Sequence, residues 1–207
     1  MRGFWKDEFF ITKDTLDPRA DTETLIEAVL FSVSDKQKAL KIVDLGTGSG
    51  CILLSLLREF PNAQGVGVDR SPEALIIAQK NRAKLGLEEQ SSFMQADWLN
   101  GIESDSVDLI VSNPPYIPTK DIDGLEKNVR DYDPMSALDG GDDGLDCYKK
   151  IIPQAAKKLK SGGSLFLEVG INQARSVKTL LQNEKFYGIK TYKDLQGIER
   201  CISGTSI

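Results

Sequence analysis

The sequence predicts an α/β fold in which a mostly parallel β-sheet is covered by helices on both faces. Strand-like apolar runs alternate with helical patterns along most of the chain, as expected for strand–helix–strand units with right-handed crossovers. The length of 207 residues suits one well-buried domain. Hydrophobic residues make up 40% and charged residues 28% of the chain, which is typical of a globular protein rather than a disordered one.

The first 20 residues are aromatic and charged without clear periodicity, so we expect an arm that packs on the domain. An amphipathic helix is predicted over 21–33, with Asp21 or Thr22 as its N-cap. We therefore divide the chain into an N-terminal arm and helix, residues 1–34, and one α/β domain, residues 35–207.

Within this domain we expect seven strands, separated by turns or helices. They are KIVDLG (41–46), QGVGVD (64–69), SSFMQAD (91–97), VDLIVSN (107–113), GSLFLEVG (163–170), YGIKTYKDL (187–195) and RCISG (200–204).

Four helices are predicted between these strands, at 49–60, 71–86, 143–160 and 172–184. Ser71 followed by a proline is typical of an N-cap, and Gly86 of the glycine that ends a helix. Pro153 is expected to kink or divide its helix because it lacks a backbone donor.

Charge and composition argue against several functions. The net charge of −5 disfavours contact with nucleic acid, which usually requires a basic face. The chain has no histidine, so it lacks the usual general base and the commonest metal ligand. Its three cysteines have no metal-ligand spacing, and no apolar run is long enough for a membrane span or a signal peptide core. We expect a cytoplasmic protein with no metal, nucleic-acid or membrane partner, and the sequence leaves its oligomeric state open.

The segment VDLGTGSG (43–50) places three glycines between a strand and a helix, where the backbone can approach a ligand closely. A tight turn without a ligand is the alternative. The G-x-G-x-G spacing differs from the dinucleotide pattern G-x-G-x-x-G. Asp44, two positions before the first glycine, would repel a pyrophosphate and attract a cationic ligand.

S-adenosylmethionine (AdoMet) fits these constraints because it carries a sulfonium and an ammonium but no phosphate. Asp69 ends the second strand and is expected to accept both ribose hydroxyls, although it is also suited to cap a helix. Asp97 ends the third strand and is expected to accept from the adenine amino group; Trp98 either covers the adenine ring or belongs to the core. The predicted cofactor-binding residues are Asp44, Gly46, Thr47, Gly48, Ser49, Gly50, Asp69, Asp97, Trp98 and Asn113.

The segment VSNPPYI (111–117) ends the fourth strand in an unusual turn. The Asn113 carboxamide and the Pro114 carbonyl supply two acceptors that can hold both hydrogens of a planar NH2 group, and Tyr116 can stack on that group. We therefore predict catalytic roles for Asn113, Pro114 and Tyr116 on a conjugated primary amine. The alternative is a strand-ending turn without chemistry.

Such a nitrogen is a weak nucleophile because its lone pair is delocalised. Two fixed acceptors would orient the lone pair toward the methyl donor, and positioning of this kind contributes up to roughly 7–11 kcal/mol in favourable systems. They would also stabilise the positive charge that develops on nitrogen. No histidine is needed, since the product can lose its proton to water.

Together, DLGTGSG, VDRSPEAL, ADW and NPPYI resemble the class I AdoMet-dependent methyltransferases, which have a Rossmann-like fold with a mostly parallel seven-stranded sheet. Asn-Pro-Pro-Tyr is shared with adenine-N6 DNA methyltransferases. The segments DPRADTETL (17–25), VRDYDPMSALDGGDDGLDCYKKI (129–151) and GGSLFLEVGINQ (162–173) resemble the protein-(glutamine-N5) methyltransferases of the HemK/PrmC type. The similarity extends from about Phe4 to the C-terminus.

This resemblance implies methyl transfer from AdoMet, leaving S-adenosylhomocysteine, to the glutamine of the Gly-Gly-Gln loop in peptide-chain release factors. It assigns Asn113, Pro114, Pro115 and Tyr116 to the substrate glutamine. The family normally carries a helical N-terminal domain that helps to bind the release factor, and the resemblance leads us to expect that this domain is absent from the chain. GIER (197–200) replaces the family's Gly-x-Asp-Arg.

Three further glycines in the acidic loop, Gly140, Gly141 and Gly144, are expected to shape the pocket wall. Arg19 and Glu23 either line the site or form a surface ion pair. Two other functions stay open at this stage. One is methylation of an exocyclic amine such as adenine N6 in nucleic acid, and the other is AdoMet binding without catalysis.

Overall fold

The computed structural model describes residues 1–130 and 132–207 and contains a seven-stranded sheet with the order β5-β4-β3-β6-β7-β9-β8. All seven predicted strands are present. They are β3 (Lys41–Leu45), β4 (Gln64–Asp69), β5 (Ser91–Gln95), β6 (Val107–Ser112), β7 (Leu159–Glu168), β8 (Tyr187–Lys193) and β9 (Glu199–Thr205).

The five strands from β5 to β7 pair in parallel, and β9 runs antiparallel to both of its neighbours. The mostly parallel sheet that the sequence predicts is therefore confirmed. The order reverses at β3, so that β4 and β6 lie on either side of it and the loops after these strands diverge. In an open parallel sheet this reversal is where ligands bind, beyond the carboxyl ends of the strands.

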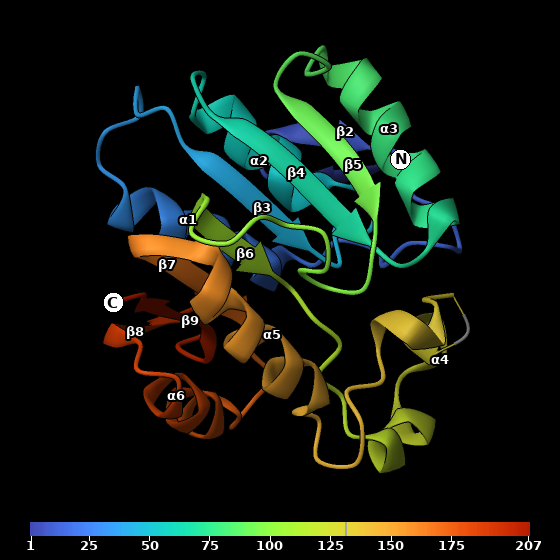
Figure 1. Ribbon diagram of the computed structural model, residues 1–207. Helices are drawn as coiled ribbons and strands as arrows, with labels where there is room; N and C mark the ends of the chain where they lie inside the picture. Colours follow the sequence, from blue (N-terminus) through green and yellow to red (C-terminus); the bar gives the residue numbers. More distant parts are fainter. Residues whose placement is uncertain (131) are drawn as a thin grey trace.

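Helices cover both faces of the sheet, as predicted (Figure 1). On one face lie α1 (Glu23–Ser32), α2 (Cys51–Glu59) and α3 (Pro72–Leu85), and on the other lie α5 (Asp146–Lys158) and α6 (Ala174–Asn183). The strands alternate accordingly. In β7, Phe166 packs with the α1 and α2 face, whereas Leu165 and Leu167 pack with α5 and α6.

The N-terminal segment forms a two-stranded antiparallel sheet of β1 (Arg2–Phe4) and β2 (Asp7–Phe9). Phe4 and Phe9 are buried in the same core cluster as α1 and α2. Asn81 of α3 holds the segment in place, because its amide accepts from the Phe10 N–H at 2.7 Å and donates to the Phe10 carbonyl at 3.0 Å. The proposed division of the chain at residue 34 remains a prediction.

The predicted helix boundaries hold at α3, where Ser71 Oγ accepts from the Ala74 N–H at 3.1 Å and Gly86 has a φ of +67°. Thr22, one of the two N-caps proposed for the first helix, does occupy the N-cap position of α1, but its side chain makes no capping hydrogen bond. A 3-10 turn, η1 (Ala20–Thr22), leads into the helix. The Thr22 hydroxyl instead accepts from Asn113, and Asp21 pairs with Arg200.

Pro153 does not divide its helix, because α5 continues from Asp146 to Lys158 with the proline inside it. The carbonyl that loses its helical partner belongs to Lys149, four residues earlier and on an exposed position. Water can replace the missing donor there, which explains why the helix is not interrupted.

Between β6 and α5 the chain makes a long excursion that contains η2 (Thr119–Gly124), α4 (Lys127–Arg130) and η3 (Met135–Ala137). Figure 1 shows this excursion beyond the arrowheads of β3 and β6, at the carboxyl edge of the sheet. Within the described ranges, none of the helices is long and apolar enough to cross a membrane.

Candidate active site

A cavity of about 150 Å³ opens at the carboxyl edge of the sheet, where the strand order reverses. The chain reaches it from seven places along the sequence. These are the N-terminal segment (14–16, 18 and 22), the turn after β3 and the start of α2 (46–49, 51 and 52), the end of β4 and the start of α3 (68–71 and 74), the end of β5 (96–98), the turn after β6 (113 and 115), the loop around η3 (134, 136, 137 and 139) and Cys147 of α5.

The glycine-rich turn forms one wall of this cavity. Gly46, Gly48 and Gly50 have φ values of +65°, +54° and +81°, a left-handed region that glycine enters without strain. Gly46, Thr47, Gly48 and Ser49 line the cavity. Gly50 does not line it. A Cβ there would lie 3.3 Å from Ala78 and Phe93, so this glycine lets α2 pack closely against its neighbours.

Asp44 lies beneath the turn, fully buried, and is not among the residues that line the cavity. One carboxylate oxygen accepts from the Thr47 hydroxyl at 2.6 Å, and the other has no hydrogen-bond partner. Burial raises the pKa of Asp44 to about 7, while the Thr47 hydrogen bond partly opposes that rise. Any effect of Asp44 on a bound cation therefore acts through the turn and through charge.

Asp69, at the end of β4, faces the cavity and also fixes the turn. One carboxylate oxygen accepts from the Gly48 N–H at 2.9 Å and the other from the Ser71 N–H at 3.0 Å. Both roles weighed from the sequence, ligand contact and a local contact before α3, are thus geometrically compatible. Each oxygen retains a lone pair that can accept from a ribose hydroxyl.

Trp98 lines the cavity and also packs against the core cluster formed with α5 and α6. Its backbone has a φ of +52°, a strained conformation for a bulky residue, which is found mainly at functional sites. Its ring lies close to Gly46, where an added Cβ would be 3.8 Å from Trp98 Cζ3. Asp97, beside it, is exposed and lines the same cavity.

The charges around the cavity favour a cation without phosphate groups. Four carboxylates (Asp14, Asp69, Asp97, Asp139) line it, and the only basic side chain among its described lining residues is Arg70. A phosphate ligand would be repelled there, whereas the sulfonium and ammonium groups of AdoMet would be attracted. The donor and acceptor groups present therefore fit AdoMet.

Two thiols, Cys51 and Cys147, also line the cavity. Burial raises the pKa of Cys51 to about 12 and that of Cys147 to about 11. Both are protonated at neutral pH and are poor nucleophiles. Cys51 and Cys147 are therefore unsuited to form a covalent intermediate with a ligand in this cavity.

Asn113 stands directly after β6, with its carboxamide between the cofactor cavity and a second cavity of about 100 Å³. Its Nδ2 donates to Thr22 Oγ1 at 3.2 Å, so its carbonyl oxygen is left to accept from a ligand. Pro114 is buried behind it, and Pro115 lines the first cavity. Among the described residues, no hydrogen bond is recorded to the Pro114 carbonyl.

Tyr116 lines the second cavity and is held at both ends. Its hydroxyl donates to Glu168 Oε1 at 3.3 Å, and its main-chain carbonyl accepts from Gln173 Nε2 at 2.8 Å. Burial raises the pKa of its hydroxyl well above the ordinary value, so the hydroxyl remains a donor at neutral pH.

Glycines allow the neighbouring loops to approach this turn closely. A Cβ on Gly140 would lie 2.8 Å from Tyr116 Cα, and one on Gly144 would lie 2.5 Å from the Tyr116 carbonyl. Gly170, which the sequence analysis did not single out, also allows close packing, because a Cβ there would lie 3.0 Å from Cδ2 of the Tyr116 ring. Gly141 has a different role, since its φ of +86° turns the loop beside Asp146.

Arg19 lines the second cavity, one of the two roles weighed for it, and the ion pair that it forms is with the buried Asp133 and not with a surface partner. Glu23 lines neither cavity, and its carboxylate accepts from the Trp5 N–H at 2.8 Å. The second cavity is otherwise apolar, lined by Leu16, Ile117, Ala137 and Leu138. It shares Leu16, Asn113 and Ala137 with the cofactor cavity, so the two are adjacent.

The sequence analysis missed three side chains that hold the site together: Thr22, Glu168 and Gln173. Thr22 was assigned as a cap, Glu168 was read as part of a strand, and Gln173 as part of a helix. Of the three, only Glu168 could have been noticed in the sequence. It is an acidic residue within the apolar strand run LFLEVG, where a charged side chain must be either exposed or paired.

Comparison with known proteins identifies the family. A family model described as "Methyltransferase domain" matches residues 36–201. The release factor glutamine methyltransferase of Caulobacter vibrioides is 43% identical over 203 residues, which cover 98% of this chain and 70% of that protein. The chain belongs to the release factor glutamine methyltransferase family.

A second member of this family, from Rhodospirillum rubrum, is 47% identical over 97% of this chain and 61% of its own length. The chain thus spans between about three fifths and seven tenths of the length of these relatives. Among solved structures, the hMettl16 catalytic domain in complex with the MAT2A 3'UTR hairpin 6 has a TM-score of 0.74. The match covers 96% of this chain and 75% of the other chain. At 14% sequence identity, this similarity establishes the methyltransferase fold alone.

Proposed function

We propose that this protein transfers a methyl group from AdoMet to the side-chain amide nitrogen of the glutamine in the Gly-Gly-Gln loop of a peptide-chain release factor, as its family membership implies. One observation carries the chemical part of this proposal. Asn113 lines both adjacent cavities, and its NH2 group donates to Thr22, which leaves its carbonyl oxygen free to accept from a ligand. An amide NH2 in the second cavity would meet that acceptor within reach of a methyl donor in the first.

The protein residues bind and orient the amide rather than deprotonate it. Asn113 Oδ1 and the Pro114 carbonyl would each accept one hydrogen, which fixes the plane of the amide and turns its nitrogen toward the cofactor cavity. Tyr116 would cover the face of the amide. Most side chains of the second cavity are apolar, an environment in which both hydrogen bonds would be strengthened as charge develops on nitrogen.

AdoMet supplies the activated methyl group in this scheme. We propose that Asp69 holds its ribose, that Asp97 and Trp98 contact its adenine, and that the turn from Gly46 to Gly50 supports it, with Asp44 acting from beneath the turn. Asn113 would contact both the cofactor and the amide.

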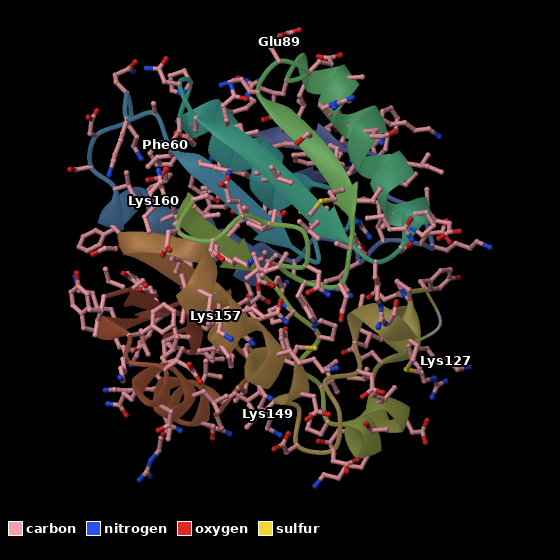
Figure 2. All side chains as sticks on the ribbon, in the orientation of Figure 1. Phe60, Glu89, Lys127, Lys149, Lys157 and Lys160 are labelled. Atoms are coloured by element: carbon pink, nitrogen blue, oxygen red, sulfur yellow. The ribbon has the colours of Figure 1, made fainter. Side chains whose placement is uncertain are left out.

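Asp69 gives the sharpest test of the cofactor site. Asp69→Ala removes the acceptor for the Gly48 and Ser71 N–H groups and the proposed ribose contact. We expect the Kd for AdoMet to rise roughly 10- to 100-fold, the value of about one hydrogen bond to a charged group. Titration calorimetry measures this change. The matched control is Glu89→Ala, since Figure 2 shows Glu89 at the opposite edge of the sheet. Equal AdoMet affinity in the two variants would contradict the assignment.

Methylation of an exocyclic amine in nucleic acid uses the same chemistry but fits this protein less well. The net charge is −5, and the cofactor cavity is lined mainly by carboxylates, whereas a nucleic-acid enzyme needs a basic surface to hold the backbone and extrude the base. The curated relatives also favour the release factor reading.

The two substrates are separated by incubating the protein with methyl-labelled AdoMet and a release factor. Label is expected on the intact release factor and not on a version whose Gly-Gly-Gln glutamine is changed to alanine. Equal labelling of both versions, or label on added DNA or RNA only, would overturn the proposal. Mass spectrometry of the loop peptide locates the methyl group.

A further inference from the structure

The Gln173 side chain joins three main-chain segments behind the proposed amide site. Its Nε2 donates to the Tyr116 carbonyl at 2.8 Å and to the Gly144 carbonyl at 3.2 Å. Its Oε1 accepts from the Gly170 N–H at 3.0 Å. Tyr116 follows β6, Gly144 precedes α5 and Gly170 follows β7, so the three partners come from separate parts of the chain. One carboxamide therefore fixes these segments relative to one another.

These partners allow only one orientation of the carboxamide. A rotation of 180° would place its oxygen against two carbonyl oxygens and its NH2 group against an N–H group. The main chain closes the same loop, because the Gln173 N–H donates to the Gly170 carbonyl at 3.1 Å while the side chain accepts from the Gly170 N–H. The two donors of the Gln173 NH2 group are thus fixed in direction.

Two glycines make room for this side chain. A Cβ on Gly144 would lie 2.6 Å from Gln173 Nε2, and one on Gly170 would lie 2.8 Å from Gln173 Oε1. The same two positions face Tyr116, at 2.5 Å from its carbonyl oxygen and 3.0 Å from Cδ2 of its ring. A side chain at either position would force Gln173 or Tyr116 to move, so the contact between them depends on both glycines.

The turn that Gln173 contacts needs an anchor from outside. Pro114 and Pro115 have no N–H group, so two consecutive residues of the turn cannot donate a main-chain hydrogen bond. The Tyr116 carbonyl, which accepts from Gln173, lies two residues beyond the Pro114 carbonyl that we assign to the substrate amide. This hydrogen bond therefore fixes the end of the turn that carries both the Pro114 acceptor and the Tyr116 ring.

We propose that Gln173 is a positioning residue for methyl transfer, which holds the Asn-Pro-Pro-Tyr turn where the Pro114 carbonyl and the Tyr116 ring can bind the amide together with Asn113. This inference rests on the proposed function. Gln173 is not among the described residues that line either cavity, so it acts through the turn and not by contact with AdoMet or the amide.

Gln173→Glu gives the sharpest test, because it keeps the shape of the side chain. At about pH 8.5, well above the usual glutamate pKa, the new carboxylate can only accept. It still accepts from the Gly170 N–H but repels the Tyr116 and Gly144 carbonyls. We expect kcat at saturating AdoMet and release factor to fall at least about tenfold, since small misplacements of reacting groups cost up to about a hundredfold.

The Kd for AdoMet, measured by titration calorimetry, should stay within about twofold in Gln173→Glu, as a positional effect on the amide alone requires. Gln182→Glu is the matched control. It makes the same chemical change at an exposed position of α6 and should leave kcat within about twofold of the wild type.

Gln173→Met separates positioning of the turn from a merely structural role. It removes all three hydrogen bonds without adding a charge, so kcat should fall less than in Gln173→Glu, where the two carbonyls are repelled. If Gln173 only closed the loop between β7 and α6, the order would be reversed. Gln173→Glu would keep that hydrogen bond and turn over like the wild type, whereas Gln173→Met would lose it.

Gly170→Ala tests the same contact without changing Gln173. Gly170 has no positive φ, so alanine suits its backbone, but the added Cβ would meet the Gln173 carboxamide and the Tyr116 ring. We expect kcat to fall about tenfold. Gly3→Ala, which adds a Cβ with nothing within 4 Å, should match the wild type. Melting curves establish that each variant is folded, and Gly170→Ala keeps the test decisive if neither Gln173 variant folds.

Several results would overturn the inference. These are wild-type kcat in Gln173→Glu, a Gln173→Met variant slower than Gln173→Glu, a loss of AdoMet affinity as large as the loss of kcat, or wild-type kcat in Gly170→Ala. A wild type that transfers no methyl group to a release factor would instead overturn the proposed function, so the two failures are distinguishable.

Discussion

Replacing Asn113 by alanine is expected to lower kcat for methylation of the release factor by about 100- to 1,000-fold, the usual loss when one preorganised hydrogen-bonding group is removed from a catalytic site. The carboxamide is the acceptor that the structure anchors at the boundary between the cofactor cavity and the second cavity. Its removal leaves the amide with the Pro114 carbonyl alone, so the lone pair of the nitrogen is no longer directed at the methyl group.

The affinity for AdoMet should change much less, within about threefold, because the other contacts proposed for the cofactor come from β3, β4 and β5. Steady-state kinetics and calorimetric titration measure the two quantities separately. Asn62→Ala is the control. Asn62 lies just before β4, at the opposite edge of the sheet, and its exposed carboxamide donates to the Gln37 carbonyl. Turnover by Asn113→Ala at the rate of this control would refute the role assigned to Asn113.

Gly140→Ala is expected to give the second large effect, although Gly140 lies outside both cavities. A Cβ there would be 2.8 Å from Tyr116 Cα and 2.9 Å from the Pro115 carbonyl. Both contacts are with main-chain atoms, which cannot rotate away as a flexible side chain can. The loop around residues 138–140 also bonds to Ile117 on both sides, through the Leu138 carbonyl at 3.0 Å and the Gly140 N–H at 2.8 Å. The methyl group must therefore displace the turn that carries Pro114 and Tyr116.

We expect Gly140→Ala to lower kcat about a hundredfold, the cost of a displacement of about 1 Å at the reacting groups. The free energy of unfolding should fall by about 1–3 kcal/mol from overpacking. Gly124→Ala is the matched control, since nothing lies within 4 Å of the Cβ it would add. Denaturant unfolding and steady-state kinetics measure both effects. Equal kcat values for the two alanine variants would show that the loop does not position the turn.

The three glycines flagged in the acidic loop show what residue type alone can indicate. Gly140 and Gly144 approach the turn after β6, whereas Gly141 serves the backbone of its own loop. Sequence reasoning assigned all three to one wall. It could not predict which of them a side chain would disturb most, because that depends on the atoms that the fold places next to each glycine.

Local sequence patterns were enough to predict the strands, the succession of strands and helices along the chain, and the residues at the strand ends. These follow from local patterns, namely apolar alternation, glycine and proline at turns, and polar residues directly after apolar runs. Parallel strands end at one edge of the sheet, so Asp69, Asp97 and Asn113 come together without further information.

How these side chains are held could not be predicted from the sequence, because their partners come from distant parts of the chain. Thr22 lies 91 residues from Asn113, Glu168 lies 52 residues from Tyr116, and Gln173 lies 57 residues from the carbonyl that it holds. Nothing in the local sequence distinguishes a threonine that caps a helix from one that anchors a carboxamide, or a strand glutamate in water from one buried behind a tyrosine. These contacts form where η1, the turn after β6, the end of β7 and the residue before α6 meet in the fold, and the packing there also buries Glu168, which raises its pKa.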